Sequence, residues 1–158
     1  MNDARAKGLG RAVVAIACAF VSACATSSAQ VATGPAITRT VGSDLQWGPC
    51  PPIFPAGCQI AVLHGDPARP NADVFLRVPG GYQIPPHSHS SPERMVLVEG
   101  QLNVRYKGQK AEVLTLGEYA YGPANKPHEA SCIGDKPCTL FIAFEGPVDA
   151  EAFAASLE

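Results

Sequence analysis

The sequence contains few charged residues and no basic cluster. Charged residues make up only 16% of the chain. The sequence has 12 lysines and arginines and 14 aspartates and glutamates, which gives a formal net charge of −2. Proteins that bind nucleic acid carry a basic patch or stripe on one face. We therefore expect no nucleic-acid partner, and we look for a small-molecule ligand instead.

The N-terminal apolar run is too short to span a membrane comfortably. Residues 12–21 follow three basic residues and have the length of the apolar part of a secretory signal. The run ends in Val21-Ser22-Ala23-Cys24. This ending resembles the lipobox of bacterial lipoproteins, in which cleavage precedes the cysteine and the cysteine sulfur is lipidated.

The lipobox resemblance divides the chain into three parts. Residues 1–23 are then a signal peptide, residues 24–40 are the lipidated Cys24 with a flexible tether, and residues 41–158 are the folded domain. We expect export to the periplasm or cell envelope, with membrane contact only through the lipid anchor. An ordinary signal peptide, cleaved near Ala23 or Ala29, is the alternative.

Long helical patterns are absent from most of the remaining sequence, which is punctuated by many of the 15 glycines and 15 prolines. Short apolar segments between turn residues favour β-strands, and together they predict an all-β fold, a small closed barrel or jelly roll. We predict strands at Gln59–Leu63, Asp73–Val78, Arg94–Val98, Leu102–Tyr106, Ala111–Leu114, Glu118–Tyr121, Glu129–Ile133 and Thr139–Glu145.

Two local patterns predict the connections and the end of the domain. Glu99-Gly100 lies between two predicted strands and is typical of a tight hairpin turn. Residues Val148–Leu157 are rich in alanine, follow Pro147 and contain Asp149 as a candidate cap, so we predict a short C-terminal helix there.

The cysteines lack the CxxC spacing that is common in zinc sites. Outside the N-terminal segment they are Cys50, Cys58, Cys132 and Cys138. An even number of cysteines in an exported domain favours disulfides, and pairing of near neighbours is the simplest of three connectivities. If residues 133–137 form a hairpin loop, Cys132 and Cys138 face each other across two paired strands. A zinc site of four thiolates is the alternative.

Three of the four histidines and one glutamate lie in two short segments. His87 and His89 are two residues apart, so on an extended segment their rings leave the same face. Glu93 begins a predicted strand and shares its face with Met95 and Leu97. His128 follows a turn bounded by two prolines. These four side chains can converge on one point, although ordinary core or surface roles are the alternative.

The two segments resemble the two motifs of the cupin superfamily. The first segment, residues 81–100, has every fixed position of G-x5-H-x-H-x3-E-x6-G. The second, residues 117–132, is similar to G-x5-P-x-G-x2-H-x3-N with two departures, Asn125 in place of glycine and Cys132 in place of asparagine. Asparagine tolerates a left-handed backbone, so the turn can be retained.

The resemblance implies a single cupin jelly-roll barrel that holds one divalent metal ion with His87, His89, Glu93 and His128. Imidazoles with one carboxylate suit Fe, Mn, Ni, Cu or Zn. Four protein ligands leave open positions on a six-coordinate metal, where a small molecule can bind. The superfamily also implies a homodimer, paired through edge strands.

Strand parity predicts an apolar cavity around this metal site. The side chains expected to face inward are Leu102, Val104, Tyr106, Leu140, Ile142 and Phe144. The tyrosines beside the two motifs, Tyr82, Tyr119 and Tyr121, are candidates for hydrogen bonds to a bound substrate. Ordinary packing of strand residues is the alternative for both groups.

Two functional hypotheses follow from the sequence. The first is a metal-dependent enzyme acting on a small organic substrate, with dioxygenase chemistry favoured because open positions on a redox metal invite O₂. The second is an envelope protein that binds a small ligand or a metal without catalysis. A purely structural envelope protein is a third alternative.

Overall fold

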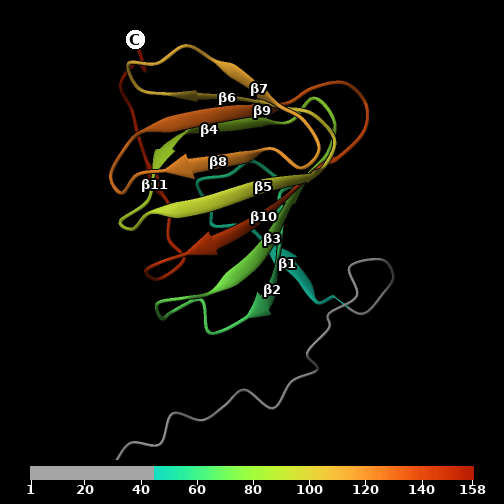
Figure 1. Cartoon of the computed structure of the whole chain (residues 1–158), viewed down its shortest axis with the longest axis vertical. Coiled ribbons are helices and arrows are strands. Elements are labelled where there is room, and N and C mark those ends of the chain that lie inside the picture. The colour runs from blue at the N-terminus through green and yellow to red at the C-terminus, as the bar shows by residue number, and fades with distance from the viewer. Residues whose placement is uncertain (1–44) are drawn as a thin grey trace, which may run out of the picture. The chain divides into compact units, whose positions relative to one another are not determined.

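The computed structural model describes residues 45–158, which form two antiparallel β-sheets packed face to face (Figure 1). The strands are β1 Trp47–Pro49, β2 Gln59–His64, β3 Asp73–Val78, β4 Gln83–Ser88, β5 Glu93–Glu99, β6 Leu102–Tyr106, β7 Glu112–Leu114, β8 Tyr119–Gly122, β9 His128–Cys132, β10 Cys138–Phe144 and β11 Glu151–Ala152. One sheet has the order β1-β2-β3-β10-β5-β8, and the other β11-β4-β9-β6-β7. The predicted all-β jelly roll is confirmed.

The core lies between the two sheets because the inward residues of each strand are apolar. In β5, Met95 and Leu97 are buried, while Arg94 and Val96, which alternate with them, are only half-buried. Strand β10 contributes Leu140, Ile142 and Phe144 in the same way. This period-two alternation is what a sheet with one buried face requires.

The predicted hairpin at Glu99-Gly100 is wrong. Strand β5 pairs with β10 and β8, whereas β6 pairs with β9 and β7, so the chain passes from one sheet to the other at this turn. Gly100 has φ of +85°, and a Cβ there would lie 2.5 Å from the carbonyl oxygen of Pro137. Glycine is therefore needed at this crossing for its left-handed backbone and for the close approach of a neighbouring chain segment.

The disulfides are Cys50–Cys58 and Cys132–Cys138, the two pairs that the sequence favours. The expected placement of the second one is wrong, however. Cys132 ends β9 and Cys138 begins β10, and these strands belong to different sheets. The Cys132–Cys138 disulfide therefore ties the two sheets together instead of crossing a hairpin.

The predicted C-terminal helix at Val148–Leu157 is also wrong. Strand β11 in this segment pairs with β4, and the Phe153 amide donates a hydrogen bond to the Pro86 carbonyl. Leu157 is only 2% exposed. Alanine has a high helix propensity, but propensity contributes little free energy per residue, and pairing with an existing sheet edge overrides it here.

Strand β4 was not among the predicted strands because Pro85 and Pro86 interrupt its pattern. The predicted signal peptide at 1–23, the lipidation site Cys24, the tether at 24–40 and the first residues of the predicted domain lie outside the described residues. Within residues 45–158, no helix is long and apolar enough to cross a membrane.

The inter-sheet disulfide should contribute measurably to stability. We expect the double variant Cys132→Ala/Cys138→Ala to lower the free energy of unfolding by roughly 2–3 kcal/mol, because the disulfide closes a short loop in the unfolded chain. Urea unfolding followed by Trp47 fluorescence measures this change. Repeating both titrations under reducing conditions is the control, since the difference between the two proteins should then shrink. If the double variant has the same free energy of unfolding as the wild type, the expectation is contradicted.

Candidate metal centre

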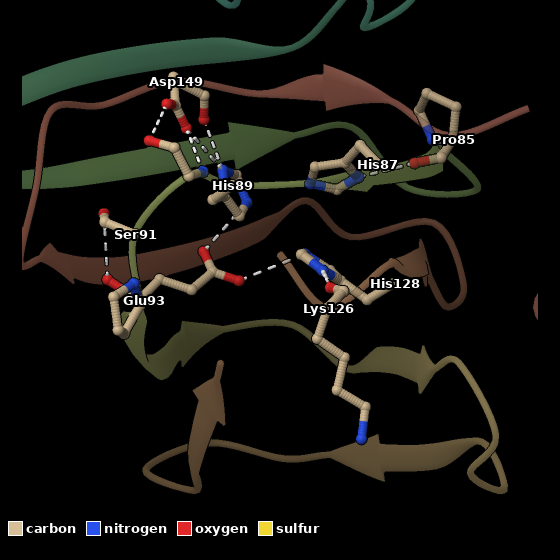
Figure 2. A network of polar contacts seen from close by, with 10 residues as sticks. Pro85, His87, His89, Ser91, Glu93, Lys126, His128 and Asp149 are labelled. Carbon is tan, nitrogen blue, oxygen red and sulfur yellow. Dashed lines mark hydrogen bonds and ion pairs between the residues drawn. The ribbon is translucent and has the colours of Figure 1, made fainter. Parts of the chain in front are cut away.

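The four predicted ligands lie together between the sheets, at one end of the barrel (Figure 2). His87 is the fifth residue of β4, and His89 follows the end of that strand. His128 begins β9 and stands opposite His87 in the β4–β9 register. Glu93 begins β5 and comes from the other sheet. The site therefore depends on both sheets and on the order of their strands.

The distances among these side chains are those of a compact cluster. The His87 and His128 ring centroids are 4.2 Å apart, and one nitrogen from each of the three rings lies within 4.8 Å of the others. The two Glu93 oxygens lie 3.2 Å from His128 Nε2 and 3.4 Å from His89 Nε2. All four side chains are buried.

The backbone orients the three imidazoles in the same sense. His87 Nδ1 lies 2.7 Å from the Pro85 carbonyl oxygen, and His128 Nδ1 lies 3.2 Å from that of Lys126. His89 Nδ1 contacts the carbonyl oxygen of Asp149. A carbonyl can only accept, so each Nδ1 carries the proton and each Nε2 presents a lone pair. Backbone contacts of this kind hold metal-binding histidines in place.

The Glu93 carboxylate lies beside these lone pairs, and one of its oxygens receives no hydrogen bond. The side chain is 2% exposed, and Oε1 has no hydrogen-bond partner among the described residues. A buried carboxylate that lacks partners is strongly disfavoured. A divalent cation at this point would compensate the carboxylate and accept all three lone pairs, and the donor set suits a transition metal. The residues present therefore fit the metal that the sequence predicts.

The electrostatics keep the cluster in its metal-binding protonation state. Burial, together with the neighbouring His128 and His89, lowers the pKa of His87 to about 3, so this ring is neutral at physiological pH. Burial by itself raises the pKa of Glu93. The close contact with His128 and the neighbouring His89 and His87 outweigh burial, and the net pKa of Glu93 is lowered.

The turn before His128 keeps its left-handed backbone although Asn125 replaces the glycine of the second motif. Asn125 has φ of +58°, in the left-handed region that asparagine tolerates. Its amide donates a hydrogen bond of 2.8 Å to the carbonyl oxygen of His89. The two motifs are thus joined directly by their backbones.

An apolar cavity extends from the four ligands into the barrel. Five of the six residues predicted to face inward line it, and Tyr106 lies beside His128 instead, with ring centroids 5.0 Å apart. The lining residues are Pro51, Phe54, Ile60, Val74, Leu76, Ile84, His87, His89, Glu93, Met95, Leu102, Val104, His128, Ala130, Leu140, Ile142, Phe144, Val148, Asp149 and Ala150.

The three tyrosines named from the motifs do not line this cavity. Tyr82 donates its hydroxyl hydrogen bond to the Pro55 carbonyl, and Tyr119 and Tyr121 are largely exposed. Sequence reasoning instead missed Asp149, whose carbonyl orients His89 and whose carboxylate accepts hydrogen bonds from the amide and hydroxyl of Ser90. The helical interpretation of residues 148–157 concealed this role.

The comparisons with known proteins agree with this fold. The family model described as "Cupin domain" matches residues 74–144. A search of the curated proteins found no significant match. Among solved structures, the polyketide cyclase RemF from Streptomyces resistomycificus is 19% identical with a TM-score of 0.61, and it covers 76% of this chain and 87% of its own.

Two further structures extend the likeness. DMSP lyase DddQ from Ruegeria pomeroyi is 19% identical with a TM-score of 0.58, over 68% of this chain and 60% of its own. An RmlC-like cupin from Shewanella frigidimarina is 18% identical with a TM-score of 0.54, over 65% of this chain and 86% of its own. The chain thus spans less than two thirds of the DMSP lyase. At these identities the likeness shows the fold and not the reaction.

Removing one proposed ligand should abolish tight metal binding. We expect His128→Ala to weaken the affinity for Zn²⁺ or Mn²⁺ by more than about 100-fold, because even outer partners of metal ligands change affinity by 10–100-fold. Calorimetric titration of chelator-treated protein measures the affinity. His64→Gln is the matched control, since His64 is exposed at the end of β2. Equal affinities in both variants contradict the assignment of His128.

The metal-free protein should lose stability on acidification. The pKa of His87 is about 3 in the fold, because of burial and the neighbouring His128 and His89, against an ordinary value of 6.5, so between these pH values the unfolded chain binds a proton that the folded chain does not. The free energy of unfolding therefore falls as the pH falls, by about 1.4 kcal/mol per pH unit from this group. Urea titrations between pH 7 and 4 measure the slope, and His87→Gln should flatten it. Identical slopes contradict the expectation.

Gly122 has no side chain, and this makes room for the side chain of Glu93. The two residues are paired across β5 and β8, and a Cβ on Gly122 would lie 2.7 Å from Glu93 Oε1 and 3.1 Å from the Tyr106 hydroxyl. We expect Gly122→Ala to displace the carboxylate and to weaken metal affinity about 10–100-fold. Gly48→Ala is the control, because a Cβ there meets no atom within 4 Å. Unchanged affinity in Gly122→Ala shows that Glu93 has room to move.

Proposed function

The chain belongs to the cupin superfamily, and on this premise we propose that it is an exported, metal-dependent protein that binds a small organic molecule, with dioxygenase-like catalysis favoured. The observation that carries the proposal is the buried Glu93 carboxylate, which lies beside the imidazole lone pairs and whose Oε1 has no hydrogen-bond partner among the described residues. A transition metal bound there supplies Lewis acidity and open positions for a ligand.

The protein's own contribution is orientation and exclusion of water. Backbone carbonyls hold the imidazoles, and the apolar walls of both sheets surround the remaining space. An enclosed apolar site strengthens every polar contact made inside it. The neighbouring structures named as a polyketide cyclase and a DMSP lyase are enzymes of the same fold, which supports catalysis as an activity that such a barrel can host.

Export is part of the proposal and is supported by two observations. The N-terminal residues have the pattern of a secretory signal ending in Cys24. The two disulfides suit an oxidising compartment.

A non-catalytic binding protein of the cell envelope is the second candidate, and one observation favours it. Among residues 45–158, the cavity holds no acid or base besides the proposed ligands except Asp149. The carboxylate of Asp149 is already occupied by the amide and hydroxyl of Ser90. A reaction that needs a separate proton-transfer group therefore lacks an evident one here.

Metal analysis followed by an oxygen assay distinguishes the two candidates. Protein purified anaerobically is analysed for metal, reconstituted with each divalent metal and mixed with phenols, flavonols or diketones under O₂. Oxygen uptake with loss of the organic compound supports the enzyme. Tight binding of an organic compound that no metal form of the protein converts supports the binding protein. Failure of the protein to bind any metal refutes both forms of the proposal.

A further inference from the structure

The cavity around the proposed metal site is lined almost entirely by carbon. Fifteen of its lining residues are apolar, and they come from both sheets and from the loop closed by Cys50–Cys58. Phe54 of that loop packs edge-on against His87 with ring centroids 5.0 Å apart. The polar lining consists of the four proposed ligands and Asp149. A ligand in this space therefore meets an apolar wall everywhere except at the metal.

The described cations are not available to this cavity, since no lysine or arginine of residues 45–158 lines it. Arg77 lies over the Trp47 ring and bonds Gln59, and Arg94 and Arg105 pair with glutamates on the outer faces of the sheets. The side chain of Lys126, whose carbonyl holds His128, extends away from the histidines in Figure 2. The walls therefore supply no positive charge to a bound anion.

The charge of the loaded site follows from its ligands. Three neutral imidazoles and one carboxylate around a divalent cation leave a net charge of +1. One negative charge on a bound molecule would be balanced by this centre. A second negative charge would be buried without a partner, which is strongly unfavourable.

From these observations we propose that the cavity selects a predominantly apolar small molecule that binds the metal through one ionisable oxygen group and carries at most one negative charge. Dicarboxylates are excluded by the missing cations. The selection rests on the proposed function, and it narrows the substrate class from small organic molecules in general to enols, phenols and related weak acids on an apolar body.

A matched pair of chelators tests the proposal on metal-loaded wild-type protein. Pentane-2,4-dione and malonate present two oxygens on the same three-carbon spacing, but the first binds as a monoanion with apolar ends and the second is a dianion. We expect the protein to bind pentane-2,4-dione at least about tenfold more tightly than malonate, relative to the same metal free in buffer. Equal or tighter binding of malonate overturns the proposal.

The metal-free protein provides a second arm that does not depend on metal loading. We expect toluene to shift the methyl NMR signals of cavity residues such as Ile60 and Val104, and benzoate to leave them unchanged, because Glu93 repels an anion. If no metal binds, the proposed function fails, and this arm alone decides the ligand class. If benzoate shifts the same methyl signals as much as toluene does, the proposed ligand class is overturned.

A wall variant tests the role of the missing cation. Leu76 lines the cavity and is only partly buried, so a lysine there can keep its ammonium group hydrated. We expect Leu76→Lys to raise malonate affinity relative to pentane-2,4-dione by about tenfold, while Leu76→Met, of similar length and uncharged, keeps the wild-type preference. An unchanged preference in a folded Leu76→Lys protein counts against the proposal; if that variant does not fold, the wild-type pairs decide.

Discussion

The structure depends on one electrostatic constraint, the placement of a carboxylate among three imidazole lone pairs inside an apolar barrel. Glu93 is almost fully buried and has one oxygen without a donor. The surrounding backbone does nothing to relieve it, because the carbonyls of Pro85 and Lys126 hold the protons of their histidines on the far side of each ring. Without a cation this arrangement is unfavourable for folding. The metal site that we propose would account for its presence in the core, whereas fold stability does not.

The rest of the barrel can be understood as support for this arrangement. Strands β9 and β10 have the proposed metal ligands near one end and the inter-sheet disulfide at the other. His128 begins β9 and Cys132 ends it, while Cys138 begins β10 and Phe144, which packs against His89, ends it. The disulfide therefore closes one end of the barrel and the ligands occupy the other. A covalent tie between the sheets at the closed end limits how far they can separate at the end where Glu93 must reach across to His128.

Local sequence patterns predicted much of this structure, because the site is built from short-range spacing. The alternation of Glu93, Met95 and Leu97 places the carboxylate on the inner face, and the His87 and His89 spacing does the same for two rings. What sequence reasoning missed depends on contacts between distant segments. The turn at Gly100 looks like a hairpin locally, yet β5 finds its partners elsewhere. The alanines near Glu151 favour a helix locally, but the edge of β4 offers better-satisfied backbone hydrogen bonds.

The lack of cations inside the barrel connects metal binding to ligand choice. Alternation along each strand puts Arg77, Arg94 and Arg105 on outer faces, where they pair with Gln59 and with glutamates. The metal is then the only source of positive charge that a ligand entering the cavity of the described domain would meet. Metal loading should therefore be required for any oxygen ligand to bind in the apolar interior, whether or not a reaction follows. The same centre limits that ligand to a single negative charge, so affinity and selectivity have one physical origin.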